Sequence, residues 1–329
     1  MYRRNCFFLG FTELVFSFLL LCACGRISHP GNGASIRILS YNTQTFFDAV
    51  DDGREFSQFR GSKSPWTESR YSVRLDRLRE VLQLAGSLTG MSPGMTPEIA
   101  VFQEIESVRV LNDLAKRLPR RADYPWAVFI PPETGSAFGS ALFSRYPVLS
   151  VKAHTIDEKT AAVRPVMQIS IDAGGVPLEI FCVHWKSKAG QSGTDAVREK
   201  QEKQLFELMI TAEKEIPESF ILACGDFNQR TDEFHLMHAY RNGWTEFCNT
   251  GADLFLEAGG GSYYYQGKWE RIDHFFYQKN GLFFEVRNFM PVAAAGLTDN
   301  AGSPLRYNLY SGTGYSDHLP IILEIKRKN

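Results

Sequence analysis

Polar residues stand at the ends of short apolar runs in several widely separated parts of this chain. Five apolar runs end in SYN at 40–42, QE at 103–104, VHWK at 183–186, GDFN at 225–228 and SDH at 316–318, and a sixth segment, RIDH at 271–274, begins such a run. Strands of one sheet bring their ends together although they lie far apart in sequence, and ligands are commonly held where buried strands reach the loops. The pattern therefore predicts a strand-rich fold with a polar site at the strand ends.

Hydrophobic periodicity separates these strands from a small number of helices. Apolar residues recur at helical spacing over Arg70–Leu88, over Val108–Leu118 and over Asp195–Glu215. Shorter apolar runs predict strands at 36–41, 98–103, 126–130, 140–143, 148–154, 166–171, 178–183, 220–223, 272–277, 283–289 and 321–325. Many strands and few long helices favour an α/β sandwich of two mixed β-sheets covered by helices over a single doubly wound sheet.

The amino-acid composition excludes several classes of protein. With 329 residues, 44% of them apolar and 22% charged, the chain is not disordered, collagen-like or a coiled coil. Its 6 cysteines are too sparse for a disulfide scaffold. The formal net charge of −1 excludes a wholly basic nucleic-acid binder but leaves room for a local basic groove. No internal repeat or Pro/Ser-rich linker divides the later chain, so we expect one domain over residues 36–329.

The first residues have the features of an export signal. Arg3 and Arg4 precede an apolar run that is densest over Leu14–Cys24. Glu13 interrupts this run, which disfavours a retained membrane anchor. We therefore expect a signal peptide over residues 1–23 and an exported protein.

The end of this segment resembles the bacterial lipoprotein box, in which cleavage occurs before a cysteine that then carries lipid. Leu21, Ala23 and Cys24 fit that box, whereas Cys22 replaces its usual small or β-branched residue. We expect lipid on Cys24 and a tether over residues 24–35, which would attach the protein to a bacterial cell membrane on its periplasmic or outer-surface side. Secretion without lipid is the alternative.

The polar residues at the strand ends share one donor chemistry. They comprise three Asp, one Glu, two Asn and two or three His, without a thiolate. Hard oxygen ligands suit Mg²⁺, Mn²⁺ or Ca²⁺ better than structural zinc. Imidazoles beside carboxylates suit proton transfer. The set predicts a site that combines a divalent metal ion with acid–base chemistry.

The ordered set of blocks resembles the endonuclease/exonuclease/phosphatase superfamily, which includes pancreatic-type deoxyribonucleases, abasic-site endonucleases, bacterial sphingomyelinases and inositol polyphosphate 5-phosphatases. The blocks are SYN at 40–42, QE at 103–104, VH at 183–184, GDFN at 225–228, ID at 272–273 and SDH at 316–318. Each block is weak alone, but six in order over residues 36–325 are specific. The resemblance implies a four-layer α/β sandwich, with two mixed sheets face to face and helices outside, and hydrolysis of phosphoesters.

The resemblance also implies a metal site. Glu104 matches the principal metal ligand, Asn42 lies beside it in the family pattern, and Asp317 is expected near the metal. The implied cofactor is Mg²⁺, with Mn²⁺ as a possible substitute. Such an ion neutralises charge that develops on the phosphoester oxygens.

The remaining matched residues receive catalytic roles from the resemblance. Asp226 and Asn228 match the pair that positions the attacking water and the phosphate oxygens. His318 matches the base or phosphate-contacting imidazole, which Asp273 orients, and His184 matches a second imidazole that contacts the phosphate or the leaving oxygen. Family members differ over whether the carboxylate or the imidazole removes the proton of the water, and both possibilities stay open at this point.

The sequence constrains the identity of the substrate less than it constrains the type of reaction. The HWKSK segment at 184–188 is similar to a form found in extracellular bacterial nucleases, and no apolar hairpin for insertion into a bilayer is evident. The basic residues expected to contact substrate phosphates are Lys186, Lys188, Arg198 and Arg271. We therefore expect a monomeric nuclease that acts on DNA or RNA. A phosphatase or phosphodiesterase of lipid head groups or inositol phosphates, and a non-catalytic binding lipoprotein, are the alternatives.

Three residues near the blocks have structural interpretations. His274 alternates with Asp273 along the predicted strand, so it faces away from the site. Cys182 and Cys224 each precede a site residue by two positions and are expected to be small buried side chains, although a cross-strand disulfide is the alternative.

Overall fold

The computed structural model describes residues 34–132, 136–156, 163–188, 194–237, 261–277, 281–294 and 296–328. The expected signal peptide, the Cys24 lipidation site and nearly all of the tether lie outside these residues. Among the described residues, no helix combines the length and apolar character needed to cross a membrane.

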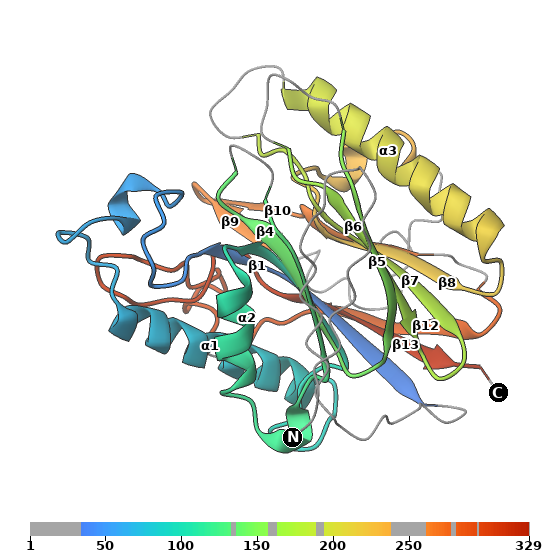
Figure 1. The fold of residues 1–329 in the computed structure, drawn as a ribbon, viewed down its shortest axis with the longest axis horizontal. Helices are drawn as coiled ribbons and strands as arrows, with labels where there is room; N and C mark the ends of the chain where they lie inside the picture. Colours follow the sequence, from blue (N-terminus) through green and yellow to red (C-terminus); the bar gives the residue numbers. More distant parts are fainter. Residues whose placement is uncertain are drawn as a thin grey trace, which may run out of the picture.

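The first large sheet is built around β1, which runs from the start of the described chain to the site. Its strands are β1 (Ser35–Phe46), β2 (Ile99–Ile105), β3 (Trp126–Ile130), β4 (Gly139–Ser144), β12 (Phe284–Pro291) and β13 (Ile321–Arg327). They are ordered β12-β13-β1-β2-β4-β3. Figure 1 labels four of them, β1, β4, β12 and β13. The sheet is mixed, because β1 pairs in parallel with β2 and antiparallel with β13.

The second large sheet is also mixed. Its strands are β5 (Val148–His154), β6 (Val166–Asp172), β7 (Pro177–His184), β8 (Phe220–Asp226) and β11 (Asp273–Tyr277). They are ordered β11-β8-β7-β6-β5, with β7 and β8 parallel and the other neighbours antiparallel. A separate hairpin, β9 (Tyr263–Tyr265) with β10 (Lys268–Glu270), was not expected from the sequence.

Three α-helices lie where helical periodicity predicted them. They are α1 (Glu68–Leu88), α2 (Val108–Ala115) and α3 (Thr194–Glu215), and the chain also forms 3₁₀ turns at Ser57–Phe59, Arg120–Ala122 and Thr231–Glu233. The side chains of Thr67 and Ser107 accept hydrogen bonds from backbone N–H groups in the first turns of α1 and α2. Such N-caps satisfy donors that would otherwise lack partners, so they fix where both helices begin.

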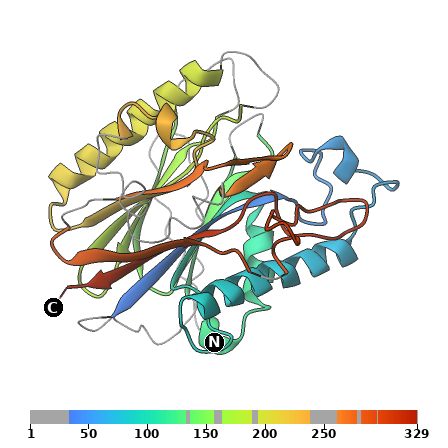
Figure 2. The same cartoon turned by 180° about the vertical axis from the view of Figure 1, so that it is seen from behind.

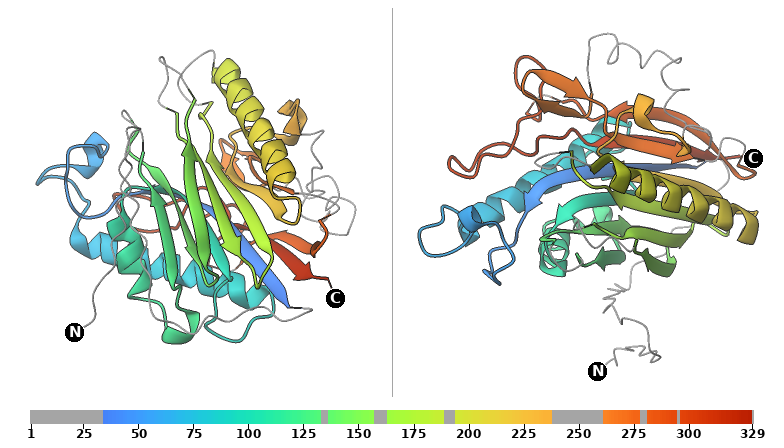
Figure 3. Two further views of the ribbon diagram at one scale, coloured as in Figure 1. Left: turned by 45° about the vertical axis from the view of Figure 1, so that its right-hand side comes forward. Right: turned by 90° about the horizontal axis from the view of Figure 1, so that it is seen from above.

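Apolar packing arranges these elements in four layers. Residues such as Ile38, Val101, Ile169 and Ile180 from the two sheets form a shared core between them. A second core joins the other face of the first sheet to α1 and α2, and a third joins the second sheet to α3. Figures 2 and 3 show α3 on one side of the paired sheets and α1 on the other. The predicted sandwich of two mixed sheets with helices outside is confirmed.

Candidate active site

The register of the strands brings the polar blocks from both sheets together. In the second sheet, Asp226 at the end of β8 pairs with His184 at the end of β7 and with Asp273 at the start of β11. In the first sheet, Asn42 pairs with Gln103, the residue before Glu104. The two groups meet across the gap between the sheets, so the site draws side chains from both of them.

Glu104 is held by a local distortion of its strand. Its φ of +63° lies in the left-handed region, at the point where the pairing of β2 with β1 and β4 shifts register. The Oε2 atom of Glu104 accepts a hydrogen bond from the Thr45 backbone N–H at 2.5 Å, and its Oε1 atom accepts one from Asn42 Nδ2 at 3.3 Å. Strained backbone fixed by such contacts is common at functional sites.

Arg74 supports the segment that holds this carboxylate. The guanidinium of Arg74, on α1, is buried and donates hydrogen bonds to the carbonyl oxygens of Thr43, Gln44 and Thr45. Both Gln44 and Thr45 have positive φ, at +53° and +48°. The Arg74 side chain thus pairs carbonyls that this unusual conformation turns toward α1, and it keeps the Thr45 N–H directed at Glu104.

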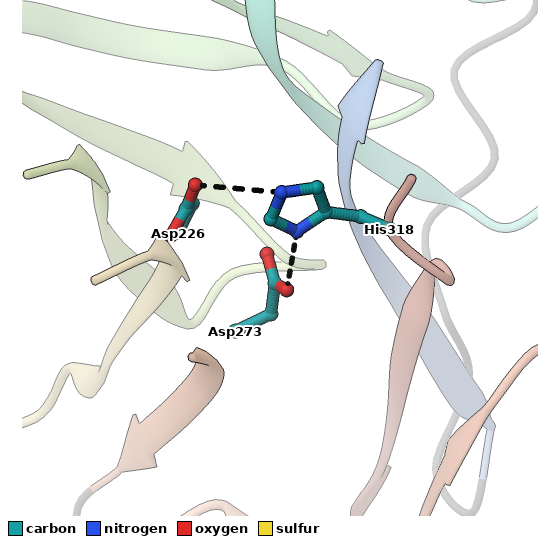
Figure 4. A group of neighbouring side chains, drawn as sticks. All are labelled: Asp226, Asp273 and His318. Carbon is teal, nitrogen blue, oxygen red and sulfur yellow. Dashed lines mark hydrogen bonds and ion pairs between the residues drawn. The ribbon is translucent and has the colours of Figure 1, made fainter. Parts of the chain in front are cut away.

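His318 and Asp273 form a buried pair. The Nδ1 atom of His318 lies 2.8 Å from Oδ2 of Asp273, and the His318 backbone N–H donates to Ser316 Oγ at 3.1 Å. Figure 4 shows the imidazole between the carboxylates of Asp273 and Asp226. Burial favours the neutral imidazole, but these carboxylates outweigh it and raise the pKa of His318 to about 10. The two carboxylates therefore favour the imidazolium form of the ring.

The carboxylate of Asp226 lies at the centre of the site. Its Oδ2 atom accepts a hydrogen bond from Asn42 Nδ2 at 2.9 Å and lies 3.7 Å from His184 Nε2 and 3.9 Å from His318 Nε2. Burial and the charge of Asp273 raise the pKa of Asp226 to about 7, although the neighbouring imidazolium opposes the shift. A carboxylate whose pKa is near neutrality is suited to take a proton from water.

His184 has the opposite electrostatic character from His318. Burial lowers the pKa of His184 well below its ordinary value, and the charges of Arg164 and His318 lower it further. Its Nε2 atom lies 3.7 Å from both Glu104 Oε1 and Asp226 Oδ2. The surroundings thus favour the neutral form of the His184 imidazole and the charged form of the His318 imidazole.

The turn after β8 needs its particular residues. Gly225 has φ of +142°, and a Cβ atom there would lie 2.0 Å from the carbonyl oxygen of Val183. Asn228 has φ of +49°; its N–H donates to Asp226 Oδ1 at 2.8 Å, and its Nδ2 atom donates to the carbonyl of Trp185 at 3.1 Å. These contacts explain the glycine, the aspartate and the asparagine of the GDFN block.

Asp317 lies beside these groups. Its charge acts on the nearby imidazole of His318, and its Oδ2 atom lies 3.7 Å from Arg306 Nε. A compact set of potential ligand atoms, within 4.8 Å of one another, comes from Asp226, Asp273 and His318. Glu104, to which Asn42 is hydrogen-bonded, is the other candidate for holding a metal ion.

Arg164 is a site residue that the sequence analysis did not identify. It directly precedes Pro165 and β6, it is partly buried, and its Nε atom has no hydrogen-bond partner among the described residues. Burial lowers its pKa, while the charges of Glu104 and Asp226 raise it. A guanidinium in this position suits an anionic substrate. A single Arg-Pro pair before a strand carries no recognisable motif, so only the fold reveals it.

The predicted substrate-binding residues have different environments. Arg198 is buried, and its guanidinium donates to the carbonyl of Lys186 and to Thr194 Oγ1, both at 3.0 Å. These bonds give Arg198 a role in joining α3 to the segment after β7, so we correct its predicted place among the phosphate contacts. Lys188 pairs with Glu233 at 2.6 Å. Lys186 and Arg271 are half-buried next to the site blocks.

The remaining expectations concern buried side chains. His274 is fully buried and its Nε2 atom lies 2.8 Å from the Gln229 carbonyl, which agrees with a structural role. Cys182 and Cys224 are opposite one another on β7 and β8, buried and not joined by a disulfide. The hairpin contributes Tyr263, whose ring centroid lies 4.7 Å from that of His318.

Comparison with known proteins agrees with this geometry. A model of the endonuclease/exonuclease/phosphatase family matches residues 37–327. The chain belongs to this family. A search of curated proteins found no match.

Solved structures of this fold cover most of the chain at low sequence identity. Truncated TDP2 of Caenorhabditis elegans is 15% identical with a TM-score of 0.59, covering 90% of this chain and 98% of that chain. TDP2 of D. rerio, complexed with a single-strand DNA product, is 16% identical with a TM-score of 0.55, covering 89% and 99%. The human nocturnin catalytic domain with bound sulfate is 14% identical with a TM-score of 0.50, covering 95% and 97%.

Family membership and the site together support one class of reaction. The family hydrolyses phosphoesters with the help of divalent metal ions, and this chain keeps acidic groups that can bind such an ion. The two imidazoles and the carboxylate between them are groups suited to acid–base chemistry. The protein is a phosphoester hydrolase by fold and by site.

Proposed function

We propose that the protein is a Mg²⁺-dependent phosphodiesterase that cleaves DNA or RNA outside the cytoplasm. The observation that carries this proposal is the convergence on Asp226 Oδ2 of Asn42, His184 and His318, with Glu104 bonded to the same asparagine. A binding lipoprotein would have no need for a carboxylate between one neutral and one charged imidazole.

The two imidazoles and the carboxylate have different roles in the proposed reaction. The carboxylates of Asp273 and Asp226 raise the pKa of His318, which favours His318 as a donor of Nε2–H to a phosphate oxygen over His318 as a base. Asp226 is then the group that removes the proton of the attacking water. Of the two bases left open by the sequence, the electrostatics favour the carboxylate. His184, which is neutral, is suited to hydrogen-bond the phosphate or the leaving oxygen.

Glu104 and Asn42 would hold the Mg²⁺ ion, with Asp317 nearby. Carboxylate and amide oxygens are the ligands that Mg²⁺ prefers. The ion would stabilise negative charge on the phosphoester oxygens. Thr45 and Asn42 orient the Glu104 carboxylate in advance, which lowers the cost of organising the site when the ion binds. Mn²⁺ has compatible ligand chemistry and is expected to substitute.

A nucleic-acid substrate is favoured by the surroundings of the site. Tyr263 packs against His318 and provides an aromatic face next to the catalytic imidazole. Arg164, Lys186 and Arg271 place cations near the same groups. The TDP2 structure with a single-strand DNA product shows that a protein of this fold accepts such a ligand. Lipid head groups and inositol phosphates are the alternative substrates.

Export and attachment complete the proposal. The basic start, the apolar run and Cys24 support removal of residues 1–23 and lipidation of Cys24. A nuclease anchored on the periplasmic or outer side of a bacterial membrane would degrade external nucleic acid without reaching the genome of its own cell. A monomer is expected.

The test is a comparison of substrates with a purified protein that begins at residue 26. Plasmid DNA, single-stranded DNA, RNA, sphingomyelin and inositol phosphates are each incubated with Mg²⁺, with His184→Ala as the matched inactive control. Cleavage of a nucleic acid by the wild type and not by the variant supports the proposal. Turnover confined to sphingomyelin or inositol phosphates would replace the nuclease with the alternative, and absence of turnover on every substrate would favour a binding protein.

A further inference from the structure

A second group of carboxylates lies in the loop between β1 and α1. Asp52 and Glu55 of this loop meet Glu106, which follows β2, and one ligand oxygen from each lies within 4.8 Å of the others. None of the three contacts the imidazoles of the catalytic site through an interaction recorded for the described residues. The group therefore needs an explanation of its own.

Glu106 has a buried oxygen without a partner. The side chain is 3% exposed, and its Oε2 atom accepts a hydrogen bond from the Asp48 backbone N–H at 2.6 Å. Its Oε1 atom is shielded from solvent and accepts no hydrogen bond from any residue that the structure describes. A carboxylate oxygen left in this state loses its hydration without compensation, which is costly. Such an atom points to a ligand that is not part of the chain.

Glu55 is fixed next to this oxygen. It is 5% exposed, and its Oε1 and Oε2 atoms accept hydrogen bonds from the backbone N–H groups of Asp52 at 2.8 Å and Gly53 at 2.9 Å. Gly53 has φ of +89°, which allows the chain to turn around the carboxylate. Each oxygen retains a lone pair, so Glu55 can bind a cation without releasing the loop.

The nearest cation, Arg54, forms no salt bridge with the two buried carboxylates, although its charge acts on both. Arg54 forms its ion pair with Asp52 at the exposed rim, with Nε 3.0 Å from Oδ2. Within the described ranges, neither Glu55 nor Glu106 forms a salt bridge. The carboxylate of Asp48 adds a further negative charge near Glu106, and it lies 3.9 Å from Arg109 Nη1. Like charges at this distance repel unless a cation lies between them.

We propose that Asp52, Glu55 and Glu106 form a Ca²⁺ site that is separate from the catalytic metal site. Ca²⁺ accepts six to eight oxygen ligands at about 2.3–2.6 Å in flexible geometry, so carboxylate oxygens within 4.8 Å of one another can share one ion. Water and loop carbonyls would complete its coordination. Mg²⁺ suits the group less, because it requires near-octahedral geometry and gives up its water reluctantly.

The consequence of this site is structural. The ion would fasten the loop after β1 to the end of β2, two residues beyond Glu104. The loop already contacts the core through Trp66, whose Nε1–H donates to the Asp48 carbonyl at 2.7 Å. Bound Ca²⁺ is therefore expected to raise the free energy of unfolding by mass action, independently of turnover.

A rival explanation makes Glu106 a neutral carboxylic acid. Burial, with the charges of Asp48 and Glu55, raises the pKa of Glu106 to about 8, so a proton could take the place of the ion. The two explanations differ in what Glu106→Gln does. The amide imitates the protonated acid, so the rival expects no loss of stability and no change in Ca²⁺ binding.

The experiment measures Ca²⁺ binding by calorimetry on the purified protein in excess Mg²⁺, which occupies the catalytic site. The wild type should bind one more Ca²⁺ ion per chain than Glu106→Gln, and its melting temperature should rise with Ca²⁺. Glu106→Gln, Glu55→Gln and the exposed Asp52→Asn should each weaken this binding, the buried pair on the order of 100-fold. Asp76→Asn on α1 is the matched control and should bind as the wild type does.

Glu104→Gln separates the two sites, because it should lose catalysis while it keeps the Ca²⁺-dependent rise in melting temperature. The proposal is overturned if the wild type shows no Ca²⁺ binding under excess Mg²⁺. It is also overturned if Asp52→Asn and Glu106→Gln, both folded, bind Ca²⁺ as tightly as Asp76→Asn does.

Discussion

The Nδ1 atom of His318 lies 2.8 Å from Oδ2 of Asp273, and both side chains are buried at the junction of the two sheets. A carboxylate behind an imidazole fixes the tautomer of the ring and stabilises its charged form. The pair therefore sets which atom of His318 faces the substrate and what charge it carries there.

Asp273→Asn is expected to lower the rate on the order of 10²-fold or more, because the amide no longer stabilises the imidazolium. The pKa of His318 should fall from its raised value, and NMR titration of the imidazole measures this directly. If the pKa of His318 is unchanged in the variant, Asp273 does not stabilise the imidazolium.

The same pair predicts the pH dependence of stability. The pKa of His318 is raised in the folded state, so its contribution is fully present below the ordinary histidine pKa of about 6.5 and is lost as pH rises toward about 10. The difference in unfolding free energy between wild type and Asp273→Asn, on the order of a few kcal/mol below pH 6.5, should shrink over this window. Urea denaturation at several pH values provides the measurement.

Asp226→Asn should cost on the order of 10² or more in kcat, since the amide cannot accept the proton of water. At limiting metal concentration, the wild-type rate should fall as pH drops through about 7. The reason is that the Asp226 carboxylate, whose pKa is raised to about 7, becomes protonated there. This acid limb should disappear in the residual activity of the variant. An acid limb that persists unchanged would assign the base to another group.

Removal of divalent ions should abolish hydrolysis, and Mg²⁺ or Mn²⁺ should restore it. Glu104→Gln keeps the shape of the side chain but removes its charge, so it should raise the metal concentration required for half-maximal rate and lower the maximal rate steeply. Full activity after exhaustive dialysis against EDTA would contradict the metal role.

Arg74→Lys should weaken metal binding at Glu104, although Arg74 itself does not contact Glu104. Lysine keeps the charge but cannot donate to three carbonyls in the arrangement that Arg74 uses, so the Thr45 N–H should hold Glu104 less firmly. Loss of such supporting contacts typically weakens metal binding about 10–100-fold. Titration of activity with Mg²⁺ should show a higher half-maximal concentration with a smaller change in kcat. A matched loss of kcat at saturating Mg²⁺ would indicate a role in the chemistry instead.

Cys24→Ser should leave the protein without lipid while the activity of the folded domain is unchanged. Labelling of cells with a fatty-acid analogue, followed by fractionation, compares the wild type with the variant. Each buried CH₂ group adds about 0.8 kcal/mol of membrane affinity, so several acyl chains make attachment effectively permanent. Wild-type protein that is cleaved but carries no label would mean ordinary secretion.

Much of the fold could be predicted because its signals are local. Helical spacing located α1 to within two residues at its start, and the apolar runs located β1, β2 and β8, which carry Asn42, Glu104 and Asp226. The polar blocks identified the site because they lie next to buried strands: His184 and Asp226 end β7 and β8, and Asp273 begins β11. The SDH block at 316–318 was expected to end an apolar run, but it lies in the loop before β13. Local patterns suffice where a side chain's place depends on its own strand.

The rest depends on contacts that no local pattern encodes. The three-residue strands of the β9–β10 hairpin are too short to give a periodicity. Arg164 and Arg198 look alike in the sequence as single basic residues, yet the charges of Glu104 and Asp226 act on Arg164, whereas Arg198 is buried at the start of α3. Their different environments arise from long-range contacts, namely the pairing of β6 within the second sheet and the packing of α3 against that sheet.

The division of the site between two sheets has a mechanical consequence. Glu104 and Asn42 belong to one sheet, and His184, Asp226 and Asp273 belong to the other, so the apolar layer between them acts as the spacer that sets their separation. Side chains such as Ile169 and Ile180 then govern reactivity from a distance, since a small slide of one sheet over the other would misalign the two halves without breaking a single bond within either. On warming, loss of this alignment is therefore expected to abolish the hydrolytic activity at a temperature below the melting temperature of the protein.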